Sequence, residues 1–209
     1  LAVGQYTSHM TGIVSLMTDN IVLGQMTLVL TGLSALCAFL IGSITSSMLV
    51  TWAKRRRLRS HFALPLALEA LLLLVFGLLG AAMDNQIAFL LPETVLVLCF
   101  TMGLQNATIT QISHSEIRTT HITGLITDFG IELGKLLYLN RRSDHQPVQA
   151  NRNKLRIHGQ LMVCFFVGGL SGALGFKHLG TITTVPLAAL LVLLVLRPAL
   201  DDWQRLHPA

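Results

Sequence analysis

Two histidines lie in nearly identical five-residue motifs, SHMTG and THITG. A histidine side chain titrates near neutral pH, so it can relay protons or bind a metal ion. A hydroxyl side chain followed by glycine lets the backbone approach a ligand closely. A helix that begins there also offers unpaired N–H groups and a positive dipole end to an anion. The alternative is structural, with each motif capping the start of a short helix. The residues concerned are His9, Thr11 and Gly12 in the first motif, and His121, Thr123 and Gly124 in the second.

Acidic side chains follow both motifs, Asp19 after the first and Asp128 after the second. The spacing of His121, Asp128, Glu132 and Lys135 predicts that all four share one face of a helix. Such a face could form a path for protons or cations. The alternative is an amphipathic helix whose polar face meets lipid headgroups, with Glu132 paired to Lys135.

Glu69 stands within the leucine-rich run LPLALEALLLLV. A charged side chain at the centre of a membrane helix costs about 2.5–3.5 kcal/mol on insertion scales, and it usually faces the bundle interior or a water-filled cavity. Glu69 is therefore either a functional group or an internal hydrogen-bonding strut. Gln105 and Asn106 close another apolar run, where they line a path or join two helices by hydrogen bonds.

No motif in the chain predicts a metal site, a cofactor or a catalytic residue. The three cysteines, Cys37, Cys99 and Cys164, are too far apart for a CxxC pair. A glycine-rich nucleotide loop, GxSxG and HExxH are all missing from the sequence. The net charge is +5 and the pI is about 9.6, but the basic residues cluster beside apolar runs rather than on a surface interleaved with aromatic residues. We therefore expect no nucleic-acid partner.

The composition predicts an all-α, polytopic transmembrane helix bundle whose partner is the lipid bilayer. Of the 209 residues, 52% are hydrophobic and only 12% are charged, against about 25% charged residues in a soluble domain. Five apolar runs are long enough to cross about 30 Å of hydrocarbon, and we interpret 1–209 as one integral membrane domain. The predicted spans are 27–53, 62–83, 88–109, 158–176 and 180–198.

The basic clusters predict the orientation of these spans. Loops 54–60 and 141–156 carry most of the arginine and lysine, so both should be cytoplasmic, while Asp84 should lie outside. The segment 113–140 then begins and ends on the cytoplasmic side. We expect it to form a re-entrant or interfacial half-helix rather than a complete span.

The chain also shows an internal repeat. After the two motifs, AFLIGSITSS aligns with CFFVGGLSGA, and LPLALEALLLLV aligns with VPLAALLVLLVL. Repeat one is 1–83 and repeat two is 88–198, and we expect a leading helix to be missing before SHMTG. Units of three spans would be inverted relative to each other, with a site near the midplane at their interface. Small residues in equivalent spans predict close helix packing, namely Gly42, Ser46, Gly168 and Gly172.

The strings SHMTG, MGLQNATI and RTTHITGLITDFGIELG resemble those of the YoaK-like family. The resemblance covers most of the chain and implies a bacterial inner-membrane protein carrying a domain of unknown function. It also implies a further N-terminal helix before SHMTG, as family members have, and it assigns no activity.

These observations favour a transporter or channel for a small solute or ion, with the repeat interface as its path. One alternative is a membrane-embedded enzyme that acts on lipid or quinone through histidine and carboxylate chemistry. A non-catalytic membrane scaffold is the other, and a homo-oligomer is compatible with all three.

Overall fold

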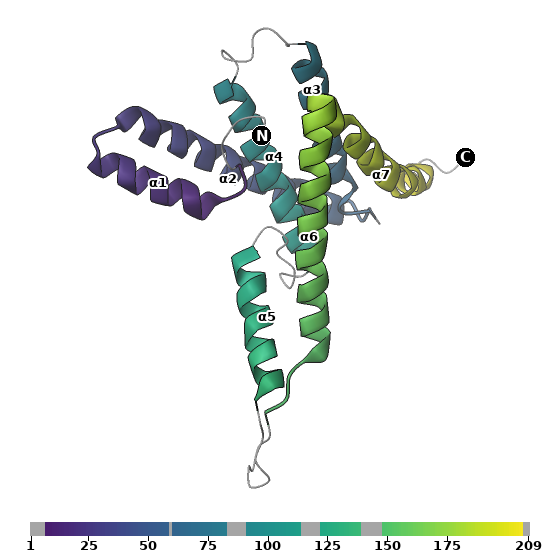
Figure 1. Ribbon diagram of the computed structural model, residues 1–209. Coiled ribbons are helices and arrows are strands. Elements are labelled where there is room, and N and C mark those ends of the chain that lie inside the picture. Colours follow the sequence, from purple (N-terminus) through teal and green to yellow (C-terminus); the bar gives the residue numbers. More distant parts are fainter. Residues whose placement is uncertain (1–6, 59, 83–90, 114–121, 139–147, 207–209) are drawn as a thin grey trace. The chain divides into compact units, whose positions relative to one another are not determined.

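A computed structural model describes residues 7–58, 60–82, 91–113, 122–138 and 148–206, and every regular element in these ranges is a helix (Figure 1). The chain forms two compact units, one of Leu1–Ile117 with Leu174–Ala209, the other of Arg118–Ala173. The elements are α1 (Met10–Val22), α2 (Met26–Arg55), α3 (Ala63–Ala82), α4 (Leu91–Ile112), α5 (Ile122–Leu137), α6 (Arg152–Leu179), the 3-10 helix η1 (Gly180–Thr183) and α7 (Thr184–Leu206).

Among the described residues, three helical stretches are long and apolar enough to cross a membrane: Met26–Arg55, Glu93–Ile112 and Arg152–Pro198. The third contains α6, η1 and the part of α7 up to Pro198. Helix α3 contributes the shorter apolar segment Ala63–Gly77. The expected all-helical architecture is confirmed for the described residues, and the three stretches have the length and apolar composition of membrane spans. The predicted spans 27–53, 62–83, 88–109 and 158–176 overlap α2, α3, α4 and α6, and 180–198 overlaps η1 and α7.

Helices α1 and α2 form an antiparallel hairpin around Gly24 (Figure 1). Gly24 has a φ of 71°, a left-handed conformation that glycine adopts without strain. The Gln25 N–H donates to the Asn20 carbonyl at 2.9 Å, which satisfies the last turn of α1 as in a Schellman motif. Ile13 and Met17 then lie against Gly32, where a Cβ would meet both side chains.

Helices α2 and α4 cross where each helix has a glycine, so their backbones come into direct contact. A Cβ at Gly42 would overlap the Phe100 carbonyl oxygen, and one at Gly103 would overlap the Phe39 carbonyl oxygen. The contacts advance together along both chains, because Phe39 meets Gly103 while Ser46 meets Thr108. The two helices therefore run in the same direction.

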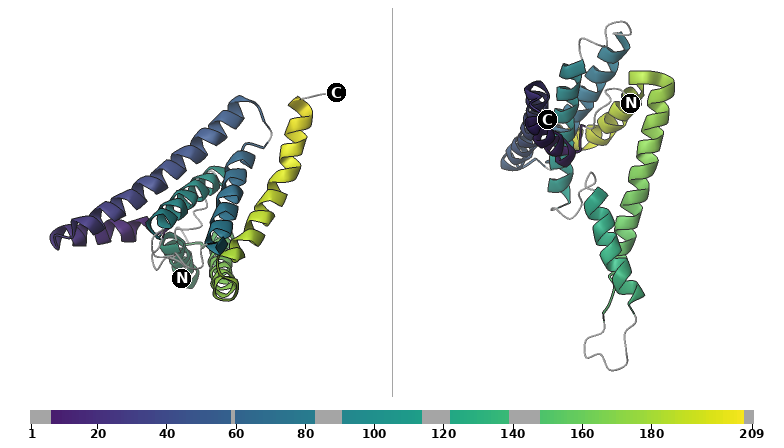
Figure 2. Two further views of the ribbon diagram at one scale, coloured as in Figure 1. Left: turned by 90° about the horizontal axis from the view of Figure 1, so that it is seen from above. Right: turned by 60° about the vertical axis from the view of Figure 1, so that its left-hand side comes forward.

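Helix α7 begins beside the C-terminal half of α3. The Thr184 hydroxyl donates to the Leu73 carbonyl at 3.0 Å, and a Cβ at Gly77 would meet Thr184 and Val185. The two helices remain together beyond this point, and Figure 2 shows them side by side. Ala188, fully buried, continues the covered face of α7.

Candidate functional site

The first motif forms the start of α1. His9 is the N-cap residue with a φ of −94°, and its carbonyl accepts a hydrogen bond from the Ile13 N–H at 3.2 Å. A Cβ at Gly12 would overlap Nδ1 of His9, so the imidazole lies over the first helical turn in the space that glycine leaves open. The H-x-T-G pattern thus has a local physical reason, since only glycine at its fourth position admits the ring.

The start of α1 is level with the middle of α2. His9 and Leu40 are equally far in sequence from the Gly24–Gln25 turn, and both helices rise by the same 1.5 Å per residue. Contacts agree with this register, because Ile13 packs against the buried cluster of Ala35, Val95 and Cys99. The first N–H groups of α1 therefore lie level with the middle of α2.

Glu69 is the most buried carboxylate of the described residues, with 3% of its surface exposed. It lies in α3, which packs against α2, α4 and α7. Within the described ranges, no hydrogen bond or ion pair joins its carboxyl group to another side chain. An ionisable group in this position, between apolar turns of a membrane helix, marks a functional-site candidate.

Hydroxyl groups line the crossing of α2 and α4. The Ser43 hydroxyl donates to the Gly103 carbonyl at 3.1 Å, and the hydroxyls of Ser46 and Thr108 are 2.8 Å apart. Ser46 and Thr108 are both buried, and Gln105 and Asn106 are half-buried on the same stretch of α4. Sequence reasoning singled out Gly42 and Ser46 on α2 but missed the small residue Gly103 and the hydroxyl of Thr108 on the α4 side of the crossing. A glycine and a threonine five residues apart in an apolar run were the available signal.

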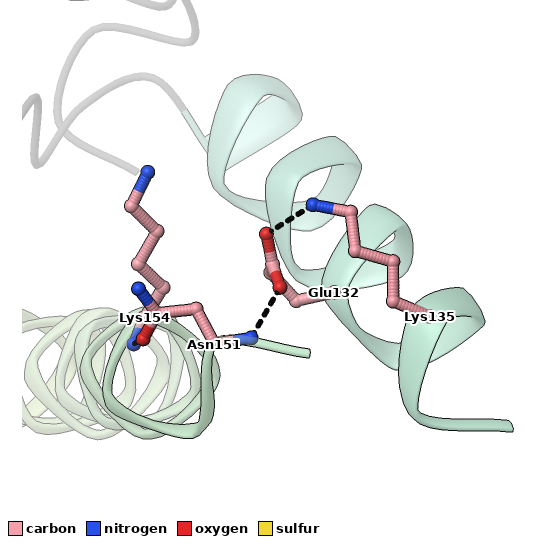
Figure 3. A network of polar contacts seen from close by, with 4 residues as sticks. All are labelled: Glu132, Lys135, Asn151 and Lys154. Atoms are coloured by element: carbon pink, nitrogen blue, oxygen red, sulfur yellow. Dashed lines mark hydrogen bonds and ion pairs between the residues drawn. The ribbon is translucent and has the colours of Figure 1, made fainter. Parts of the chain in front are cut away.

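In the second unit, Glu132 joins α5 to the first turn of α6 (Figure 3). Its Oε1 accepts from Lys135 Nζ at 2.8 Å, and its Oε2 accepts from the Asn151 backbone N–H at 2.7 Å. Asn151 in turn caps α6, because its side-chain oxygen accepts from the Lys154 N–H at 3.1 Å. The expected pairing of Glu132 with Lys135 is therefore present.

This arrangement resembles a capping box whose acid comes from another helix. In an ordinary capping box, a glutamate three residues after the N-cap accepts from the N-cap N–H. That position is Lys154 here, so Glu132 of α5 supplies the carboxylate. The hydrogen bond from Lys135 lowers the pKa of Glu132 from its ordinary value, and the hydrogen bond from Asn151 lowers it further.

The two carboxylates of α5 have different surroundings. Glu132 is buried with Leu125, whereas Asp128 is exposed. Thr123 and Gly124 are also exposed, and His121 lies outside the described residues. The face predicted to contain His121, Asp128 and Glu132 together thus has one buried, bonded carboxylate and one exposed carboxylate.

The remaining candidates lie on exposed surfaces. Thr11 and Asp19 are exposed on α1, and Gly168 and Gly172 are exposed on α6. No atom lies within 4 Å of a Cβ built at either α6 glycine, in contrast to the close contact at Gly42. Within the part of the chain that the structure describes, no group of three His, Cys, Asp or Glu side chains could hold a metal ion.

Over residues 1–197 the chain matches the family described as "Protein of unknown function (DUF1275)". The chain belongs to this family. The resemblance of its motifs to the YoaK-like proteins is thereby confirmed. No curated protein and no solved structure matches the chain.

Proposed function

We propose that this protein transports a small solute or ion across the bacterial inner membrane, through the interface of two inverted repeats. A small anion is the class of substrate that the site favours. The observation that carries the proposal is the depth at which α1 begins. Its N-terminal N–H groups, with His9 and Thr11, start level with the middle of the membrane-crossing helix α2. Half-helices that start at the midplane direct their positive dipole end at an anionic group in known transporter designs.

The length of the two short helices supports this interpretation. Helix α1 has 13 residues and α5 has 16, so they extend about 20 Å and 24 Å at 1.5 Å per residue. Both are shorter than the roughly 30 Å of hydrocarbon that a complete span must cross. Each of them also starts directly after the histidine of its motif, α1 at Met10 and α5 at Ile122.

The direction of the helices in the first unit supports a half-helix at α5. Helices α2 and α4 run the same way, so Arg55 and Ile112 end on the same side, which we take to be cytoplasmic. Helix α3 begins on that side, and α7 begins beside the C-terminal half of α3, toward the opposite side. Between Ile112 and Thr184 the chain must therefore cross the membrane an odd number of times. Helix α6 supplies one crossing. The segment with α5 then makes no complete crossing, and the chain leaves it on the side from which it entered.

The order of the elements supports the repeat itself. Helices α1, α2 and α3 form a sequence of short, long and medium helices with 13, 30 and 20 residues. Helices α5, α6 and α7 follow the same order with 16, 28 and 23 residues. The matched segments around Gly42 and Gly168 fall in α2 and α6, as an alignment of the two triplets requires.

Glu69 gives this transport a proton-carrying group. Glu69 is buried in α3, the helix that packs against α2 and α4. Exchange between the charged and neutral forms of its carboxyl group would move one proton for each transport cycle. A carboxylate would also repel an anion when charged, so protonation of Glu69 and anion entry should favour each other.

Swelling of proteoliposomes tests the proposed transport. Vesicles that contain valinomycin and a protonophore swell in an iso-osmotic potassium salt at a rate set by the entry of its anion, because the protonophore lets any proton that enters with the anion leave again. We expect the protein to accelerate swelling in at least one of chloride, nitrate, acetate, phosphate or sulfate. Glu69→Gln should abolish this acceleration of swelling because it removes the proton-carrying carboxyl group. Gly12→Ala should abolish it because the added methyl group displaces His9 from the first turn of α1. Gly130→Ala, which adds a methyl group where no atom is near, is the matched control. Swelling equal to that of protein-free vesicles in all five salts would contradict anion transport.

Cysteine labelling in intact cells tests the topology. In a background without Cys37, Cys99 and Cys164, we expect a membrane-impermeant thiol reagent to label a cysteine at Asn85 and to spare one at Ser143. This pattern requires an α5 segment that does not cross. Labelling of both positions would mean that α5 spans, and the repeats would then be parallel rather than inverted.

A further inference from the structure

The end of α2 carries four consecutive cations, Lys54, Arg55, Arg56 and Arg57, and all four are exposed. No aspartate or glutamate occurs in the sequence between Asp19 and Glu69. Among the described residues, the one ion pair is that of Lys135 with Glu132, in the other unit. The carbonyl groups at a helix C-terminus favour a positive charge, but four adjacent cations repel one another unless an anion from outside the chain lies between them.

The backbone fixes how these cations are presented. The Arg57 N–H donates to the Lys54 carbonyl at 3.0 Å, and the Leu58 N–H donates to the Ala53 carbonyl at 3.1 Å. Arg57 has a φ of 54°, a left-handed conformation that is uncommon for a residue other than glycine. The chain therefore turns back at Arg57 and keeps the four cations around one helix end instead of extending them along a loop.

Trp52 adds an aromatic surface one turn earlier. Half of its surface is exposed, and the Arg56 guanidinium carbon lies 5.6 Å from the centre of its ring, within cation–π range. Tryptophan is enriched at the level of the lipid headgroups, where its ring is half in hydrocarbon. At that level, the contact with the Trp52 ring would place Arg56 near the lipid phosphates.

We infer that the Trp52–Arg57 turn at the end of α2 binds the headgroup of an anionic phospholipid. Guanidinium groups match the oxygens of a phosphate diester bidentately, and clusters of four or more cations beside a membrane helix are typical of acidic-lipid binding. The basis is charge complementarity together with the fixed turn and the tryptophan. Positive-inside orientation requires cations in this loop, but it requires neither the left-handed turn nor the contact of Arg56 with Trp52. The inference does not depend on what the protein transports.

Native mass spectrometry of the detergent-purified protein tests this site, with phosphatidylglycerol as the probe and phosphatidylcholine as the neutral lipid. We expect adducts of phosphatidylglycerol to exceed those of phosphatidylcholine by at least fivefold. The double variant W52A/R56Q should lose that preference, although it keeps the other cations that orient α2. Arg152→Gln removes one exposed cation from the other basic cluster and is the matched control, which should bind like the unaltered protein.

Two further arms keep the test decisive. Arg56→Lys preserves the charge and the orientation but loses the planar fork, so we expect severalfold fewer phosphatidylglycerol adducts from a protein with unchanged circular dichroism. Glycerol 3-phosphate at millimolar concentration should not displace the lipid, since it lacks the acyl chains beside Trp52. Equal binding of both lipids would overturn the inference. So would equal losses in R56K and the Arg152→Gln control, or displacement by glycerol 3-phosphate.

Discussion

The crossing of α2 and α4 should fail when either of its glycines gains a methyl group. At Gly42 the new Cβ meets the Phe100 carbonyl and the Leu104 N–H, and at Gly103 it meets the Phe39 carbonyl. These are backbone atoms of a helix, so no side-chain rotation relieves the overlap and the two helices must separate. Separation also pulls the Ser46 hydroxyl away from Thr108.

Three terms set the size of the effect of Gly42→Ala. Overpacking in a closely packed interior costs about 1–3 kcal/mol, and a backbone overlap belongs in the upper half of that range, at about 2.5 kcal/mol. An interhelical hydrogen bond in a membrane contributes about 0.6 kcal/mol. Alanine recovers about 1 kcal/mol of helix propensity relative to glycine. The net destabilisation is about 2 kcal/mol, which corresponds to roughly a 30-fold shift toward the opened state.

Cys99 reports this opening directly. Its side chain has 0% exposure and packs in the buried cluster at this crossing, whereas Cys37 and Cys164 are exposed. In a variant with serine at both exposed cysteines, a maleimide reacts with Cys99 only when α2 and α4 part. When reclosing is faster than labelling, the rate follows the opening equilibrium. We therefore expect Gly42→Ala to raise the labelling rate of Cys99 about 30-fold, in proportion to the shift estimated above.

The double variant and a control decide the mechanism. Once one methyl group has separated the helices, the second meets no backbone, so G42A/G103A should label at nearly the rate of the single variants. Gly130→Ala, on α5 in open space, should leave the rate unchanged. A labelling rate for Gly42→Ala equal to that of the parent protein would refute the crossing, and additive single effects would refute a shared contact.

Two further predictions concern helix ends. Arg57→Gly should raise the thermal unfolding midpoint, because glycine removes about 1–2 kcal/mol of left-handed strain against about 0.5–1 kcal/mol of added chain entropy; a lower midpoint would show that Arg57 is not strained. The pKa of Glu132 is lowered in the folded protein, so its contribution is complete above its ordinary pKa of 4.5 and is lost as the pH falls through the lowered value. The protection factor of the Asn151 N–H, which is its exchange rate relative to that of an unfolded peptide at the same pH, should accordingly fall in acid. Glu132→Gln should weaken this acid response, and an identical response in that variant would assign it to another group.

Several features followed from local sequence patterns alone. Long apolar runs with few charges can satisfy their backbone in hydrocarbon only as helices, so the helices at 27–53 and 88–109 were predictable. Gly12 and Gly24 act within a few residues of chain, through the space over a helical turn and through a left-handed φ. The pairing of Glu132 with Lys135 follows from a three-residue spacing on one helix.

Contacts between distant segments were not predictable in the same way. Gly42 and Gly168 hold equivalent places in the repeated sequence, yet Gly42 is in close contact with α4 while Gly168 faces open space. Asp128 and Glu132 share a predicted face, but Asn151 bonds only Glu132. Each difference depends on a partner many residues away in the sequence, and local hydropathy and residue spacing do not identify that partner.

By itself, therefore, the amino-acid sequence determined the helices, their membrane character and the family, because each depends on local composition or on a contiguous motif. Only the tertiary structure decided that α2 and α4 cross at Gly42 and Gly103, that α1 begins level with the middle of α2, and that Glu132 caps α6. The physical reason is that a helix exposes small or polar residues on several faces at equal local cost. The choice among those faces is made by the neighbouring helix that fits closely against one of them.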